Sequence, residues 1–185
     1  MEQNNTIEMV FENLIKEYQS SLKLYYPAHR SNGFTERNLT FNFCSLYKEK
    51  RKEFDKNPNI AVWQEVPINN KQHFDSLIID FDKKTVYIIE AKRLYNKNYY
   101  EKLKEDLKRI KFYYPEIPDF QKSISSFSIY AILLTDLWTS KSDKKGHTKL
   151  ELKKQVEKEW EKPFKYIFAT ENEIYHISYF IEKIL

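Results

Sequence analysis

Apolar side chains recur along this chain at two spacings, and each spacing predicts a kind of element. Helical spacing is seen in the stretch that ends at Pro115 and in the stretch that begins after Thr35. Threonine is a residue suited to cap the start of a helix. Runs rich in β-branched and aromatic residues predict strands. The expected elements are helices at 5–22 and 35–53, strands at 60–68, 77–81 and 86–89, a helix at 99–114, a strand at 127–135, a helix at 149–160 and a strand pair within 166–179. This order predicts an α/β fold.

Charged residues stand at the ends of two adjacent predicted strands, where a sheet should be dry. A symmetric hairpin turning at 82–85 puts Asp75, Glu90 and Lys92 on one face, because side chains alternate along a strand. Asp75 then lies diagonal to Glu90, within reach of a cross-strand neighbour. The expected pairs are Phe81 with Val86, Ile79 with Ile88, Leu77 with Glu90 and Asp75 with Lys92.

Two converging carboxylates beside a lysine suit a divalent cation. Magnesium takes oxygen ligands and needs only one or two carboxylates when substrate phosphate completes its shell. A nearby lysine is suited to position or activate water. The alternative is a structural cross-strand ion pair with a spare acid. An acid two residues before a lysine occurs five times in the chain, but only Glu90 to Lys92 ends an apolar strand that follows an aspartate-bearing strand.

The segment from Asp75 to Val-Tyr-Ile-Ile-Glu90-Ala91-Lys92 resembles the PD-(D/E)xK nuclease superfamily, with Phe74 where the family usually has proline. The resemblance covers about residues 33–135 and implies a restriction-endonuclease-like αβββαβ core, a mixed central sheet flanked by helices, within a single domain spanning 1–185. It implies that Asp75 and Glu90 bind Mg²⁺ with the backbone carbonyl of Ala91. Lys92 would orient or activate the attacking water.

Two further glutamates are candidate accessory residues, since many related nucleases carry one on the first helix and one on the first strand. Glu36 shares a helical stripe with Leu39 and Phe43, which points it toward the sheet. Its alternative role is to complement the helix dipole. Glu65 lies on the first predicted strand, where Pro67 indicates an edge or an end, and its alternative is an exposed acid.

Composition limits the other possibilities. The chain has 185 residues, two glycines and 16% aromatics, which favours a packed domain over a disordered one. A single cysteine, Cys44, excludes a disulfide framework and is expected to pack in the core. The amino terminus lacks the pattern of a signal peptide and no apolar run reaches membrane-spanning length, so a cytoplasmic protein is expected.

The net charge of +4 is unevenly distributed. Residues 92–114 carry eight Lys or Arg against three acids, and residues 141–158 carry seven lysines against three acids. Such surfaces neutralise nucleic-acid phosphates, and the interleaved tyrosines are suited to stack on unpaired bases. The alternative is a set of ordinary solvated helix faces. The candidate nucleic-acid-binding residues are Arg93, Lys97, Lys104, Lys108, Lys144 and Lys145.

These features together predict a DNA nuclease dependent on Mg²⁺ or Mn²⁺, working alone, as a homodimer or with a larger DNA-recognition partner. Its role stays open between restriction, anti-phage defence and repair. The main alternative is a non-catalytic nucleic-acid-binding or cleavage-complex subunit that retains the nuclease fold. Action on RNA is a third class, although nothing in the sequence marks recognition of the 2′-hydroxyl.

Overall fold

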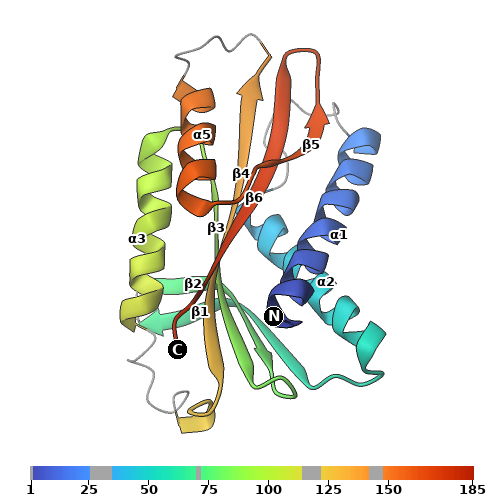
Figure 1. Ribbon diagram of the computed structural model, residues 1–185, viewed down its shortest axis with the longest axis vertical. Helices are drawn as coiled ribbons and strands as arrows, with labels where there is room; N and C mark the ends of the chain where they lie inside the picture. The colour runs from blue at the N-terminus through green and yellow to red at the C-terminus, as the bar shows by residue number, and fades with distance from the viewer. Residues whose placement is uncertain (1, 26–34, 70–71, 114–121, 142–147) are drawn as a thin grey trace.

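A computed structural model describes residues 2–25, 35–69, 72–113, 122–141 and 148–185 (Figure 1). The predicted order of helix, three strands, helix and strand is observed, and most predicted bounds lie within a few residues of the structure. The elements are α1 (Glu2–Tyr25), α2 (Glu36–Phe54), β1 (Ile60–Asn69), β2 (Gln72–Asp80), β3 (Thr85–Arg93), α3 (Lys97–Tyr113), β4 (Ser128–Ser140), α5 (Thr148–Trp160), β5 (Lys165–Ala169) and β6 (Glu173–Lys183).

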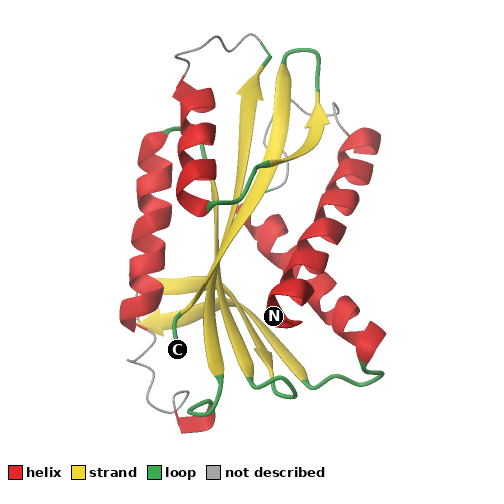
Figure 2. Ribbon diagram, viewed as in Figure 1, coloured by secondary structure: helices red, strands yellow, loops and turns green. Residues whose placement is uncertain are grey.

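The strands form one mixed six-stranded sheet in the order β1-β2-β3-β4-β6-β5 (Figure 2). β2 pairs antiparallel with both β1 and β3, and β4 pairs parallel with β3. A parallel neighbour needs a crossover connection, and α3 lies within it. The interior position predicted for the strand at 127–135 and the edge position suggested by Pro67 are both confirmed.

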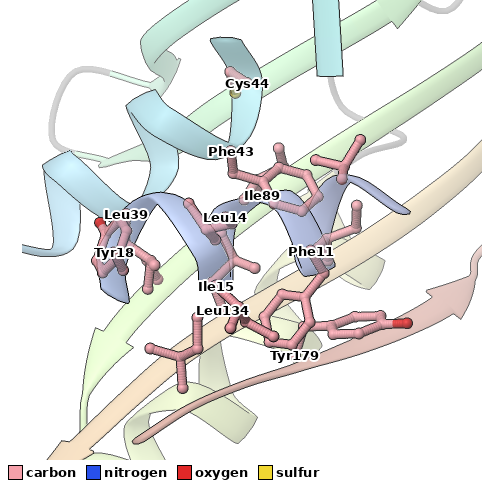
Figure 3. Packing of buried hydrophobic residues seen from close by; sticks show 14 of the residues in the cluster. Phe11, Leu14, Ile15, Tyr18, Leu39, Phe43, Cys44, Ile89, Leu134 and Tyr179 are labelled. Carbon is pink, nitrogen blue, oxygen red and sulfur yellow. The ribbon is translucent and has the colours of Figure 1, made fainter. Parts of the chain in front are cut away.

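Helices cover both faces of the sheet (Figure 1), as expected for an α/β protein. On one face, α1 and α2 pack against β3, β4 and β6, and Figure 3 shows this cluster around Phe11, Leu14, Phe43 and Leu134. Cys44 belongs to the same cluster, which confirms its predicted packing role. On the other face, α3 and α5 bury a second cluster that includes Leu103. Among the described residues, no helix has the length and apolar character that a membrane crossing requires.

The hairpin between β2 and β3 differs from the predicted one by two residues in register. Asp80 pairs with Thr85, so the turn covers residues 81–84 and not 82–85. Thr85 is fully buried within β3, and Lys84 takes the tight backbone bend with a φ of 48°. All four predicted cross-strand pairs are therefore wrong. The shared face survives, because a shift of two residues preserves the alternation of side chains.

In both β1 and β2 the alternation of side chains between the two faces of the sheet is interrupted at the same level. Val62 and Ile78 pack with the α1–α2 cluster, whereas Val66 and Phe74 pack with the α3–α5 cluster. In regular strands Val62 would share a face with Val66, and Ile78 with Phe74. The change occurs beside Glu65, whose φ of 53° lies in the left-handed region that non-glycine residues rarely adopt. The sheet is thus irregular where Asp75 enters the site.

Candidate active site

Asp75 stands at the point where pairing between β2 and β3 ends. The last paired residues are Ser76 and Ile89. Just beyond them, the Oδ2 atom of Asp75 accepts a hydrogen bond of 2.8 Å from the backbone N–H of Ala91. The carboxylate is thereby fixed against β3, next to Glu90. The structure therefore brings Asp75 to Glu90, not to Lys92 as the predicted register implied.

Asp75, which is partly buried, and Glu90, which is fully buried, form a pair of adjacent carboxyl groups. Burial, followed by the charge of Asp75, raises the pKa of Glu90 to about 9. Burial also raises the pKa of Asp75, while hydrogen bonds from Ala91 and from the Glu90 carboxyl act in the opposite direction. The glutamate is only 2% exposed. Two acids that hold a proton between them can exchange that proton for a cation, which is the behaviour expected of paired metal ligands.

Lys92 lies on the same face of β3 and reaches across to α3. Its Nζ atom donates a hydrogen bond of 2.8 Å to Oδ2 of Asp106. Burial alone would lower the pKa of Lys92, but Asp106, Glu36 and Glu90 together raise it above its ordinary value. Lys92 therefore carries a held ammonium group, suited to donate hydrogen bonds and less suited to act as a base.

The sequence analysis missed Asp106 and Arg109, which bring α3 into the site. Arg109 Nη2 forms an ion pair with Oε1 of Glu90 and a second one, at 3.2 Å, with Oδ1 of Asp106. A signal for Asp106 existed in the sequence. It follows Leu103 by three residues and precedes Ile110 by four, so it lies on the buried stripe of the helix and not on its solvated face.

Glu36 points toward the sheet, as its helical stripe predicted. Its Oε1 atom accepts a hydrogen bond of 2.8 Å from the backbone N–H of Arg93. Burial raises the pKa of Glu36; the charge of Lys92 acts to lower this pKa and the charge of Asp75 acts to raise it. Thr35 caps the helix through a hydrogen bond to Asn38. Glu36 therefore lies at the border of the site, in the first turn of α2.

Glu65 pairs with two surface residues away from the carboxyl pair. It forms ion pairs of 3.1 Å with Nε of Arg37 and 2.8 Å with Nε2 of His73, and all three side chains are largely exposed. Its position in the sheet is level with Asp75, between the pairs Gln64–Ser76 and Val66–Phe74, but its side chain is exposed. As a metal-site accessory, Glu65 receives no support from these contacts.

The predicted nucleic-acid-binding residues divide into four groups. Arg93 is buried, and its guanidinium donates hydrogen bonds of 2.9 and 2.6 Å to Oδ2 of Asp136, so its expected surface role is wrong. Lys97 and Lys108 are exposed on α3. Lys104 is only partly exposed, since it pairs with Glu101 and Glu159. Lys144 and Lys145 lie outside the described residues.

A cavity of about 500 Å³ opens beside Glu36 at the end of β3. Its lining includes Thr35, Arg37, Arg93 and Tyr95. The Tyr95 side chain is half exposed and makes an edge contact with Tyr99, with 5.0 Å between ring centroids. The cavity therefore combines cationic and aromatic groups beside Glu36.

The site can hold a hard divalent cation if two carboxylates from the protein are completed by oxygens from water and substrate. Within the described ranges, no three His, Cys, Asp or Glu side chains form a group arranged to hold a metal ion. Asp75 and Glu90 supply two carboxylates, and the backbone of Ala91 lies between them and Lys92. Two carboxylates suffice when water and substrate phosphate provide the other oxygens, as magnesium sites commonly require. The site thus suits a cation that binds together with its substrate.

Comparisons with protein-family models, curated proteins and solved structures return no match for this chain.

The raised pKa of Glu90 predicts how the stability of the protein changes with pH. The free side chain titrates near 4.5 and the folded one near 9, so the folded state holds an extra proton between these values. Stability should therefore fall as pH rises through this window. We expect thermal unfolding without divalent cations, measured from pH 5 to pH 9, to show this decline in the wild type and a weaker decline in Glu90→Gln. Equal slopes in the two proteins would contradict the assignment.

Proposed function

We propose that this protein is a Mg²⁺-dependent deoxyribonuclease that hydrolyses phosphodiester bonds. The observation that carries the proposal is the buried carboxyl of Glu90 beside the partly buried carboxyl of Asp75, with the ammonium of Lys92 on the same face of β3. Two acids placed together with so little exposure to water are costly to maintain, and such groups concentrate at functional sites. Glu90 lies near the carboxyl end of β3, an interior strand of the sheet, and Asp75 on the neighbouring β2.

The arrangement of elements supports the same proposal. The order α2, β1, β2, β3, α3, β4 is the αβββαβ order implied by the resemblance to PD-(D/E)xK nucleases. The candidate acids and lysine lie on the second and third strands of that series, where the resemblance expects them. An agreement of fold and motif is stronger support than the short motif alone, because the motif recurs by chance in a lysine-rich chain.

The chain's own residues divide the work of such a reaction. Asp75 and Glu90 would hold the cation, with the carbonyl of Ala91 as a further oxygen. When bound, a divalent cation supplies Lewis-acid polarisation of the phosphate and lowers the pKa of an attached water. Lys92 donates hydrogen bonds toward the attacking oxygen or the phosphate. Asp106 holds the lysine ammonium at 2.8 Å and so fixes its direction.

A cleavage assay tests the proposal directly. Purified protein is incubated with single-stranded, nicked, linear and supercoiled DNA, with Mg²⁺ or with a chelator. We expect cation-dependent cleavage of at least one substrate. Absence of cleavage on every substrate, in both Mg²⁺ and Mn²⁺, would count against a nuclease.

One observation favours the second candidate, a non-catalytic nucleic-acid-binding module. Every charged group of the site already has a partner within the protein, since Glu90 pairs with Arg109 and Lys92 with Asp106. A scaffold would need no cation in such a network. Calorimetric titration of Mg²⁺ or Mn²⁺ separates the two candidates. Heat of binding that disappears in Asp75→Ala favours the nuclease, and no binding favours the module.

The exposed lysines of α3 are proposed to contact the DNA backbone, and two of them differ in a measurable way. Lys108 is exposed, whereas the ammonium of Lys104 lies 2.9 Å from Glu101 and 4.9 Å from the ring centroid of Tyr100. We expect Lys108→Gln to weaken DNA binding and to reduce the dependence of log Kd on log salt by about one unit. Lys104→Gln, one turn away, should have a smaller effect. Fluorescence anisotropy across a salt series measures both, and an unchanged salt slope in Lys108→Gln would contradict this contact.

A further inference from the structure

The proposed reaction does not explain the contacts of Arg109. It comes from α3, it was not expected from the sequence motif, and it forms an ion pair with the same Glu90 that would bind the cation. We propose that Arg109 is a built-in counter-ion of Glu90 that competes with the divalent cation, so that α3 sets the cation affinity of the site. This inference rests on the proposed metal-dependent function.

The first step of the argument is the environment of Glu90. Its side chain is 3% exposed and lies beside the carboxyl of Asp75. When Glu90 ionises, as cation binding requires, a carboxylate buried in that position needs a compensating positive charge. Arg109 provides it through Nη2, on the Oε1 atom. A cation bound between Asp75 and Glu90 would supply the same compensation, so the two positive charges are alternatives for one oxygen.

The second step is that Arg109 has a second acidic partner. The same Nη2 atom lies 3.2 Å from Oδ1 of Asp106, one helical turn earlier on α3. Release from Glu90 therefore leaves the guanidinium with an acidic partner, which lowers the cost of the exchange. Asp106 meanwhile keeps Lys92 on its other oxygen. The aspartate thus links the two positive groups of the site.

The third step is that Arg109 is incompletely satisfied where it stands. Its Nε atom is buried and has no hydrogen-bond partner among the described residues. A guanidinium fixed for structural reasons normally uses its fork of donors in a bidentate pair. Arg93 shows the contrast in this chain, since both its Nε and Nη2 bind Asp136. Arg109 is therefore held less completely, as a displaceable counter-ion would be.

The matched variants are Arg109→Gln and Lys111→Gln. Both remove one positive charge from the same helix, but the acidic partner of Lys111 is Glu182 of β6, at 2.8 Å, and not Glu90. Calorimetric titration with Mn²⁺ then measures the dissociation constant of each protein. We expect Arg109→Gln to bind the cation about tenfold more tightly than the wild type, and Lys111→Gln to stay within about twofold. Without cation, Arg109→Gln should melt at a lower temperature and recover more on adding Mn²⁺.

The outcomes separate this inference from the proposed function. Binding in the wild type with no gain in Arg109→Gln would overturn the counter-ion role and leave the nuclease proposal standing. No binding in either protein would overturn both. If Arg109→Gln does not fold, as judged by circular dichroism, Arg109→Lys replaces it. The lysine keeps the charge but loses the planar fork, so we expect a two- to threefold gain in affinity, and no gain would overturn the inference.

Discussion

Glu90→Gln is expected to lower Mg²⁺-dependent DNA cleavage by about 1,000-fold, which corresponds to about 4 kcal/mol of transition-state stabilisation. The amide keeps the shape of the protonated carboxyl but cannot become an anionic ligand. Because Glu90 is buried beside Asp75, this change should leave the fold intact or relieve repulsion within the pair. Initial rates on the best DNA substrate, with the circular dichroism spectrum of each variant, measure the effect.

Companion variants make the result specific to the site. Asp75→Asn and Lys92→Met should lose cleavage to a similar degree, the first through the cation and the second through the attacking oxygen. Glu105→Gln is the control, because it removes an exposed acid from α3 beside Asp106. It should cleave at the wild-type rate. Full activity in Lys92→Met would exclude the role given to its ammonium, and full activity in Glu90→Gln would remove the basis of the metal site.

Asp136→Asn is expected to produce the largest loss of stability, about 3–5 kcal/mol. Asp136 is 4% exposed, and its Oδ2 atom accepts hydrogen bonds from the guanidinium of Arg93 and, at 2.7 Å, from the hydroxyl of Tyr175. Removing its charge would leave the arginine buried without compensation. Urea denaturation measures the free energy of unfolding before and after the change.

Tyr175→Phe provides the matched comparison within the same cluster. It deletes one hydrogen bond but leaves the ion pair between Arg93 and Asp136, so the expected cost is about 1 kcal/mol. A cost for Asp136→Asn no greater than this would show that the buried ion pair contributes little. The structure makes Arg93 a core residue, and the comparison measures how much its ion pair with Asp136 contributes to stability.

The elements could be predicted from the sequence because each depends on a local pattern. The apolar stripe that contains Leu103 and Ile110 is enough to define α3, and Thr35 is enough to begin α2. The hairpin register was harder. The register depends on whether Phe81 or Thr85 belongs to the turn. Thr85 is fully buried in β3, and local propensity does not report this burial.

The site could be predicted only for residues within the hairpin. Asp75, Glu90 and Lys92 lie on two strands joined by a short turn, so the pairing of β2 with β3 brings them close together although the alternation of β2 is interrupted at this level. The partners of Arg93, by contrast, lie on β4 and β6, and nothing local in the chain reveals them. Asp106 and Arg109 were hidden for another reason. They were counted among the charges of an exposed helix face, although Asp106 lies on the buried stripe.

The charged groups around Glu90 come from a short part of the chain, β2, β3 and α3, with Glu36 of α2 at the border of the site. Elements that are neighbours in sequence can meet with little loss of loop-closure entropy. We therefore expect the reactive centre to assemble as the hairpin docks against the crossover helix, independently of the later strands β5 and β6. β6 and β5 lie toward the opposite edge of the sheet from β2. We therefore expect insertions and substitutions in these two strands to reduce activity the least.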